Sequence, residues 1–158
     1  LQLVHPEDLE QVQQALGGTV REAMLAFRQK RWDASLRLFL KVRQLAVFLG
    51  QTGLLARVDQ AIVTSAFQLG EIDLAAEVER RILAAAEKAK DAAAVARARN
   101  FLGVLESRRG NYGVAIQELQ LAVTGLDLMT SFSAVAASIN NLGPGLAEVG
   151  AHYADLHD

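Results

Sequence analysis

The stretch Asn100-Phe-Leu-Gly-Val-Leu-Glu-Ser-Arg-Arg-Gly-Asn-Tyr-Gly-Val-Ala-Ile-Gln-Glu-Leu-Gln-Leu-Ala-Val123 decides the fold of this chain. Each half places apolar residues at the three- and four-residue spacing of one helical face. Between the halves stands Gly110, and glycine adopts the left-handed conformation that ends many helices without a Cβ penalty. Gly103 and Ala115 are small, which predicts a close helix crossing. The stretch therefore predicts two packed helices joined by a tight turn.

The same features recur along the chain in steps of 40 residues. Such recurrence in several columns is typical of a helical repeat, in which each helix pair packs on the next. The columns in phase are Lys30, Gly70, Gly110 and Gly150; Trp32, Ile72, Tyr112 and His152; Ser35, Ala75, Ala115 and Asp155; Ala23, Val63, Gly103 and Gly143; and Phe39, Glu79 and Leu119.

The order Leu102-Gly103, Gly110-Asn-Tyr112 and Ala115 resembles a tetratricopeptide repeat, of the longer type found in kinesin light chain and in bacterial regulators. That resemblance implies an all-α fold, a right-handed superhelical array of antiparallel helix pairs (a TPR-like α-solenoid). It also implies a protein- or peptide-binding module that serves as the regulatory or interaction part of a larger signalling protein.

The repeat predicts residues 1–18 as a lead-in or capping helix and residues 19–158 as the array. The repeats are expected at about 19–50, 54–90 and 91–127, with a partial repeat at 132–158 that Gly143-Pro144-Gly145 interrupts. The lead-in helix starts near Pro6 and ends at Gly17-Gly18; the alternative is the tail of a preceding domain. Turns are predicted at Lys30-Arg31 and Gly70-Glu71, and Asp33, Asp73 and Asp91 suit helix starts.

Composition narrows the classes of function. The chain of 158 residues has a net charge of −2 and no cysteine, so the sequence predicts neither a nucleic-acid partner nor a disulfide or thiolate metal site. Neither a membrane span nor a signal peptide is visible, so a cytoplasmic location and no membrane partner are expected. Because the first residue is leucine, we expect a piece of a longer protein.

No catalytic constellation is visible, and we expect no enzyme, no cofactor and no metal site. His152, Asp155 and His157 have a loose spacing for zinc, and a solvated helix end is the favoured interpretation. Glu77 and Glu79 are predicted on a solvated helical face, where a carboxyl group keeps an ordinary pKa.

The resemblance places binding residues on the first helix of each pair, which lines the groove of such arrays. The predicted groove residues are Arg57, Gln60, Thr64, Gln68, Arg97, Asn100, Arg108 and Asn140, with Val20, Met24, Phe27 and Arg28 at the equivalent places in the first repeat. Amides can pair with a peptide backbone and arginines can bind carboxylates. The alternative is the ordinary polar side of amphipathic helices.

Two further alternatives remain open at the level of sequence. The cluster Arg97, Arg99, Arg108 and Arg109 is either a solvated face or a contact for an anionic partner. The array itself is either a capture module or a structural module that forms a homodimer or packs between domains, and the apolar pair Phe27 and Phe67 favours the latter.

Overall fold

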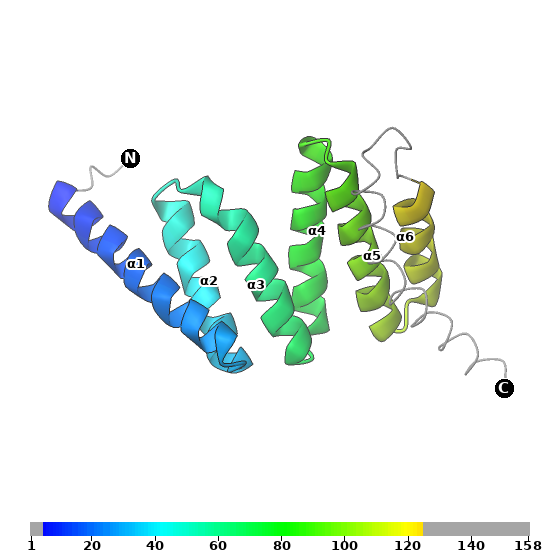
Figure 1. Ribbon diagram of the computed structural model, residues 1–158, viewed down its shortest axis with the longest axis horizontal. Helices are drawn as coiled ribbons and strands as arrows, with labels where there is room; N and C mark the ends of the chain where they lie inside the picture. Colours follow the sequence, from blue (N-terminus) through cyan, green and yellow to red (C-terminus); the bar gives the residue numbers. More distant parts are fainter. Residues whose placement is uncertain (1–4, 125–158) are drawn as a thin grey trace. The chain divides into compact units, whose positions relative to one another are not determined.

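The computed structural model describes residues 5–124, and all regular structure within that range is helical (Figure 1). The all-α prediction is confirmed, whereas the superhelical arrangement remains a prediction. The helices are α1 (Pro6–Arg28), α2 (Trp32–Phe48), the short 3₁₀-helix η1 (Thr52–Leu54), α3 (Leu55–Gln68), α4 (Ile72–Lys88), α5 (Ala92–Arg108) and α6 (Tyr112–Thr124).

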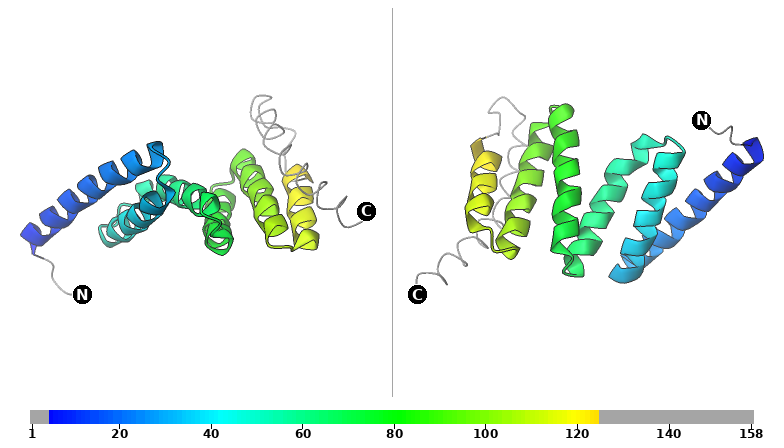
Figure 2. Two further views of the ribbon diagram at one scale, coloured as in Figure 1. Left: turned by 90° about the horizontal axis from the view of Figure 1, so that it is seen from below. Right: turned by 180° about the vertical axis from the view of Figure 1, so that it is seen from behind.

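The chain divides into two compact units, Leu1–Ala75 and Ala76–Asp158, with the boundary inside α4. In the first unit α2 packs against both α1 and α3, and in the second α5 packs against α6 (Figures 1 and 2). Ser35 and Ser65 share a buried hydrogen bond of 2.9 Å between α2 and α3. The predicted fourth repeat at 132–158, with Asn140 and Gly143-Pro144-Gly145, lies outside the described residues.

Five helix ends repeat one turn geometry at intervals of 20 residues. Each turn holds a residue with positive φ, and the amide of the following residue donates to the carbonyl oxygen five residues back over 2.9–3.1 Å. This bond pattern satisfies carbonyl groups that the end of a helix leaves unpaired. The predicted turns at Lys30, Gly70 and Gly110 are confirmed. The residues with positive φ are Lys30 (56°), Gly50 (69°), Gly70 (77°), Lys90 (54°) and Gly110 (82°).

The starts of the helices follow the predicted signals. Asp33 and Asp73 lie in the first turns of α2 and α4, where a carboxylate faces the positive end of the helix dipole. Asp91 caps α5, because its side chain accepts a hydrogen bond of 3.1 Å from the amide of Ala94. Pro6 begins α1 after His5, as predicted.

The predicted helix end at Gly17-Gly18 is wrong, because α1 continues through both glycines to Arg28. Glycine in a helix interior costs about 1 kcal/mol relative to alanine. Burial outweighs that cost: one stripe of α1 is covered on both sides of the glycines. The stripe consists of Leu16, Thr19, Ala23 and Ala26. The lead-in helix and the first helix of the first repeat are therefore one element.

The predicted close crossing between α5 and α6 is confirmed. A Cβ atom placed on Gly103 would lie 2.8 Å from Cγ of Leu119 and 3.3 Å from the backbone oxygen of Ala115. Ala115 and Leu119 are themselves buried. The two helices therefore approach so closely that only a residue without a side chain fits at position 103.

Candidate functional site

The outer face of α3 carries four of the predicted groove residues. Arg57, Gln60 and Gln68 are exposed, and Thr64 is half-buried with its hydroxyl donating to the carbonyl oxygen of Gln60 over 3.0 Å. Their spacing places them along one side of the helix. The fold thus presents one cationic and several uncharged hydrogen-bonding groups on a continuous helical face.

On α5 the corresponding residues are divided between surface and interior. Arg97 and Arg108 are exposed, whereas Asn100 is 7% exposed and Val104 is 8% exposed. Asn100 is therefore a buried position of α5, with little surface left for a ligand. The last predicted groove residue, Asn140, lies beyond the part of the chain that the structure describes.

A small apolar cavity opens where α1, α2 and α3 meet. Its volume is about 230 Å³, and its lining includes three of the residues predicted for the first repeat. Phe27 is held edge-on against Trp32 at 5.4 Å and against Phe39 at 6.3 Å between ring centroids. The lining consists of Met24, Phe27 and Arg28 of α1, Phe39 of α2 and Ala61 of α3. The predicted groove face of α3 borders this cavity, because Ala61 lines the cavity and follows Arg57 by one turn.

The arginine cluster of the second unit is not a single basic surface. Arg99 donates to Glu118 of α6 over 3.0 Å and to Glu87 of α4 over 2.9 Å. Arg109 donates to Glu106 over 3.1 Å. Arg99 thus holds α4, α5 and α6 together, whereas Arg109 is exposed and pairs within the end of α5. The interpretation as one solvated or anion-binding cluster does not hold for Arg99.

Glu106 is the centre of a buried polar network that the sequence analysis missed. It is 3% exposed, and it accepts hydrogen bonds from Arg80 at 2.7 Å, from Arg109 and from the side chain of Asn111 at 2.8 Å. The four equivalent positions of the other helix ends are alanines, at 26, 46, 66 and 86. The break in that alanine series is the sequence signal that could have indicated a special residue.

The prediction of a solvated Glu79 is wrong. Its residue surface is 3% exposed, and burial raises the pKa of its carboxyl group from 4.5 to about 7. Glu77, two residues earlier, is exposed as expected. The 40-residue columns carried the signal, since Glu79 is in register with the buried residues Phe39 and Leu119.

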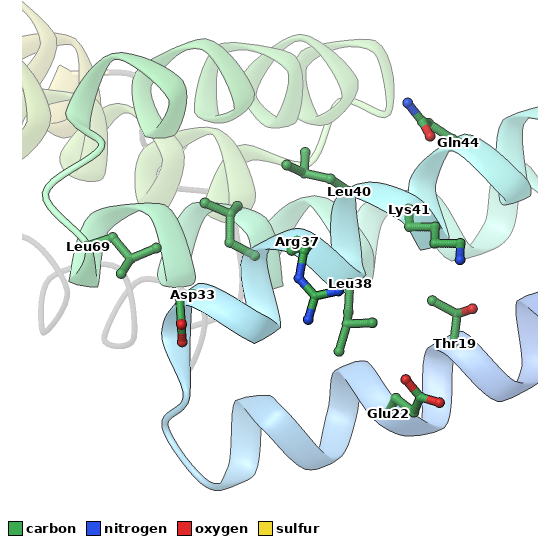
Figure 3. A pocket seen from close by; sticks show the side chains of 10 residues that line it. Thr19, Glu22, Asp33, Arg37, Leu38, Leu40, Lys41, Gln44 and Leu69 are labelled. Atoms are coloured by element: carbon green, nitrogen blue, oxygen red, sulfur yellow. The ribbon is translucent and has the colours of Figure 1, made fainter.

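A second, larger cavity of about 790 Å³ lies over the outer side of α2 (Figure 3). Thr19 and Glu22 of α1 border it on one side, and Leu69 at the end of α3 also lines it. Its walls mix leucines with both signs of charge. The α2 residues that line it are Asp33, Leu36, Arg37, Leu38, Leu40, Lys41 and Gln44.

Within residues 5–124, no three histidine or acidic side chains gather in a way that could hold a metal ion. Among the helices described there, none is both long and apolar enough to cross a membrane.

Comparison with known proteins yields short similarities. No family model matches the chain. A stretch of 40 residues is 58% identical to the Trk system potassium uptake protein TrkH of Vibrio parahaemolyticus, covering 25% of this chain and 8% of that protein. A stretch of 33 residues is 58% identical to the TrkH of Halomonas elongata, covering 21% of this chain and 7% of that protein. The chain therefore spans less than a tenth of the length of these curated relatives.

Proposed function

We propose that this chain is a protein- or peptide-binding helical-repeat module of a larger protein. The observation that carries the proposal is the exposed face of α3, with Arg57 and Gln60, beside the apolar cavity that Ala61 lines. Amide and guanidinium groups next to an apolar recess offer a peptide both backbone hydrogen bonds and a place for a side chain. The 40-residue period and its resemblance to tetratricopeptide repeats support the same function.

The structural alternative is a homodimer formed through the leucine-lined cavity of Figure 3. Four leucines surrounded by two acidic and two basic side chains form a surface that could pair with a copy of itself. The matches to TrkH cover a quarter of the chain or less, and potassium uptake is not part of this proposal.

Selection from a displayed library of random peptides tests the proposal directly. We expect the full chain to enrich peptides whose affinity falls about tenfold in Gln60→Ala or Arg57→Ala, since each substitution removes a hydrogen-bonding group from the α3 face. The matched control is Arg37→Ala, which removes an exposed arginine from α2. The proposal fails if no peptide is enriched, or if the enriched peptides bind the two α3 variants as well as the original chain.

A further inference from the structure

The first half of α1 is uncovered, although its sequence continues the buried stripe of the second half. Leu9, Val12 and Leu16 follow one another at the three- and four-residue spacing that the stripe keeps up to Ala26. Leu16 is buried, but Leu9 is 38% exposed and Val12 is half-buried, and the other residues in the range 5–15 are exposed. The N-terminal turns of α1 lie apart from α2, whereas its last turns lie beside α2 (Figures 1 and 2). The packing of α1 therefore begins at Leu16.

Two consecutive glycines follow this first buried residue, and close packing does not require them. A Cβ atom on Gly17 would lie 3.6 Å from Nη1 of Arg21, and one on Gly18 would lie 3.9 Å from Nη2 of the same side chain. Both are ordinary van der Waals distances to the end of a flexible side chain. At Gly103, by contrast, a Cβ atom would lie 2.8 Å from Cγ of Leu119. Because glycine loses more conformational freedom in a helix than alanine does, Gly17 and Gly18 weaken α1 without a gain in packing.

A side-chain hydrogen bond spans the same two glycines. The hydroxyl of Thr19 donates to the carbonyl oxygen of Ala15 over 2.7 Å. In a regular α-helix that oxygen accepts from the backbone amide of residue 19, and a threonine hydroxyl that shares it slightly destabilises the helix and often bends it. The glycine pair and this bond thus coincide with the boundary between the uncovered and the covered half of α1.

The two halves of α1 differ in the packing that stabilises them. Isolated helices shorter than about 12–15 residues are marginal in water, and helices in proteins depend on the burial of an apolar face. Before the glycines, Leu16 is the one buried side chain of α1. After them, Thr19, Ala23 and Ala26 are buried, and Phe27 makes edge-on contacts with aromatic rings of α2. The first half therefore has the lower stability.

We propose that Gly17-Gly18 is a hinge that divides α1 into two segments that open separately. Residues 6–16 change together between a helical and an open form, while residues 19–28 stay helical until the first unit unfolds as a whole. Such local opening is expected where few apolar contacts hold a segment. Both cavities of the first unit are lined by Thr19 and later residues, so the opening leaves their walls in place. The first half of α1 is thus a conformational switch that the rest of the first unit does not follow.

Amide hydrogen exchange of the full chain, measured residue by residue by NMR, tests the hinge. We expect the amides of residues 10–16 to be protected to a common extent and to exchange about a hundredfold faster than those of residues 23–28, with the step at the two glycines. The double variant Gly17→Ala, Gly18→Ala should slow exchange in residues 10–16 about tenfold to thirtyfold, because alanine favours the helical form over the open one.

Gly103→Ala is the matched control, since it makes the same change of side chain in α5, at a position where glycine is needed. It should speed exchange in α5, because the new methyl group meets Leu119, and it should not slow exchange in residues 10–16. Equal protection on the two sides of Gly17-Gly18 would overturn the hinge. So would a gradual rise of the exchange rate from Leu16 to Pro6 without a step, or a double variant whose residues 10–16 exchange as fast as in the original chain.

Discussion

Glu79 shows how a fold changes the chemistry of one residue. Its carboxyl group is buried at a position where the equivalent residues of α2 and α6 are Phe39 and Leu119. Removing a carboxylate from water disfavours its charged form, so the pKa rises from 4.5 to about 7. The folded chain therefore binds a proton more tightly than the unfolded chain does.

This difference predicts how the free energy of unfolding depends on pH. Between pH 4.5 and about 7 the folded state holds more protons than the unfolded state, so stability is highest below this window and falls as pH rises through it. The full loss would be about 3 kcal/mol. Urea titrations of the original chain and of Glu79→Gln measure the effect as the difference between their two pH profiles.

Glu79→Leu supplies the opposite test of the same residue. It places an apolar side chain in register with Phe39 and Leu119, so it should raise the free energy of unfolding above pH 7 and change it little near pH 4. The exposed Glu77→Leu is the control. Parallel pH profiles for the original chain and both Glu79 variants would contradict the shifted pKa.

At the scale of elements, the turns are the most regular feature of the chain. Glycine occupies three of the five positions with positive φ, and lysine occupies the other two, Lys30 and Lys90. A side chain at positive φ places its Cβ too close to the neighbouring carbonyl oxygen, at a cost of roughly 1–2 kcal/mol. The fold tolerates the lysines because the bonds across the turn are still made.

Substitutions at two of these turns should therefore have opposite signs. Gly110→Val forces a β-branched residue to a φ of 82° and should lower the free energy of unfolding by about 2 kcal/mol. Lys90→Gly relieves the strain at 54° and should raise it by a few tenths to 1 kcal/mol, after the larger entropy of the unfolded glycine is counted. Thermal unfolding measures both, with exposed Gln117→Ala as a control. Equal melting temperatures for Gly110→Val and the control would contradict the role of this turn.

At the scale of the whole molecule, helices that follow one 40-residue period carry different side chains at equivalent surface positions. In the second unit, Arg80 of α4 forms an ion pair with Glu106 of α5, and Glu87 of α4 forms one with Arg99 of α5. The residues 40 positions earlier, on α2, are Leu40 and Val47, which are 37% and 53% exposed. The repeat preserves the helix register and leaves the surface chemistry free to vary.

Because Leu40 and Val47 are apolar and exposed, we ask whether the protein is a monomer or a dimer in solution. We expect sedimentation equilibrium of the full chain to give a monomer, because a binding module needs an open face. A dimer would favour the alternative, a structural role. In that case Leu40→Glu, at the wall of the cavity in Figure 3, should dissociate it, whereas Arg57→Ala on α3 should not.

The sequence by itself determined several turns and helix starts. The turns at Gly70 and Gly110 and the helix start at Asp91 were predictable, because backbone conformation there depends on glycine and on a cap within a few residues. The small size of Gly103 and Ala115 also predicted the close crossing between α5 and α6. The exposure of Arg57 and Gln60 agrees with both interpretations of these residues, the groove that the resemblance implies and the ordinary polar side of a helix.

Only the tertiary structure decided which faces are covered. The path of α1 through Gly17-Gly18, the burial of Glu79 and the cavity beside Ala61 each depend on several elements packing together. A local pattern shows which face of a helix is polar and which is apolar. Burial depends on neighbouring helices that lie tens of residues away in the sequence. Packing then outweighs local preference, so α1 continues through two glycines. The same packing buries Glu79, whose charged form is disfavoured by the loss of water.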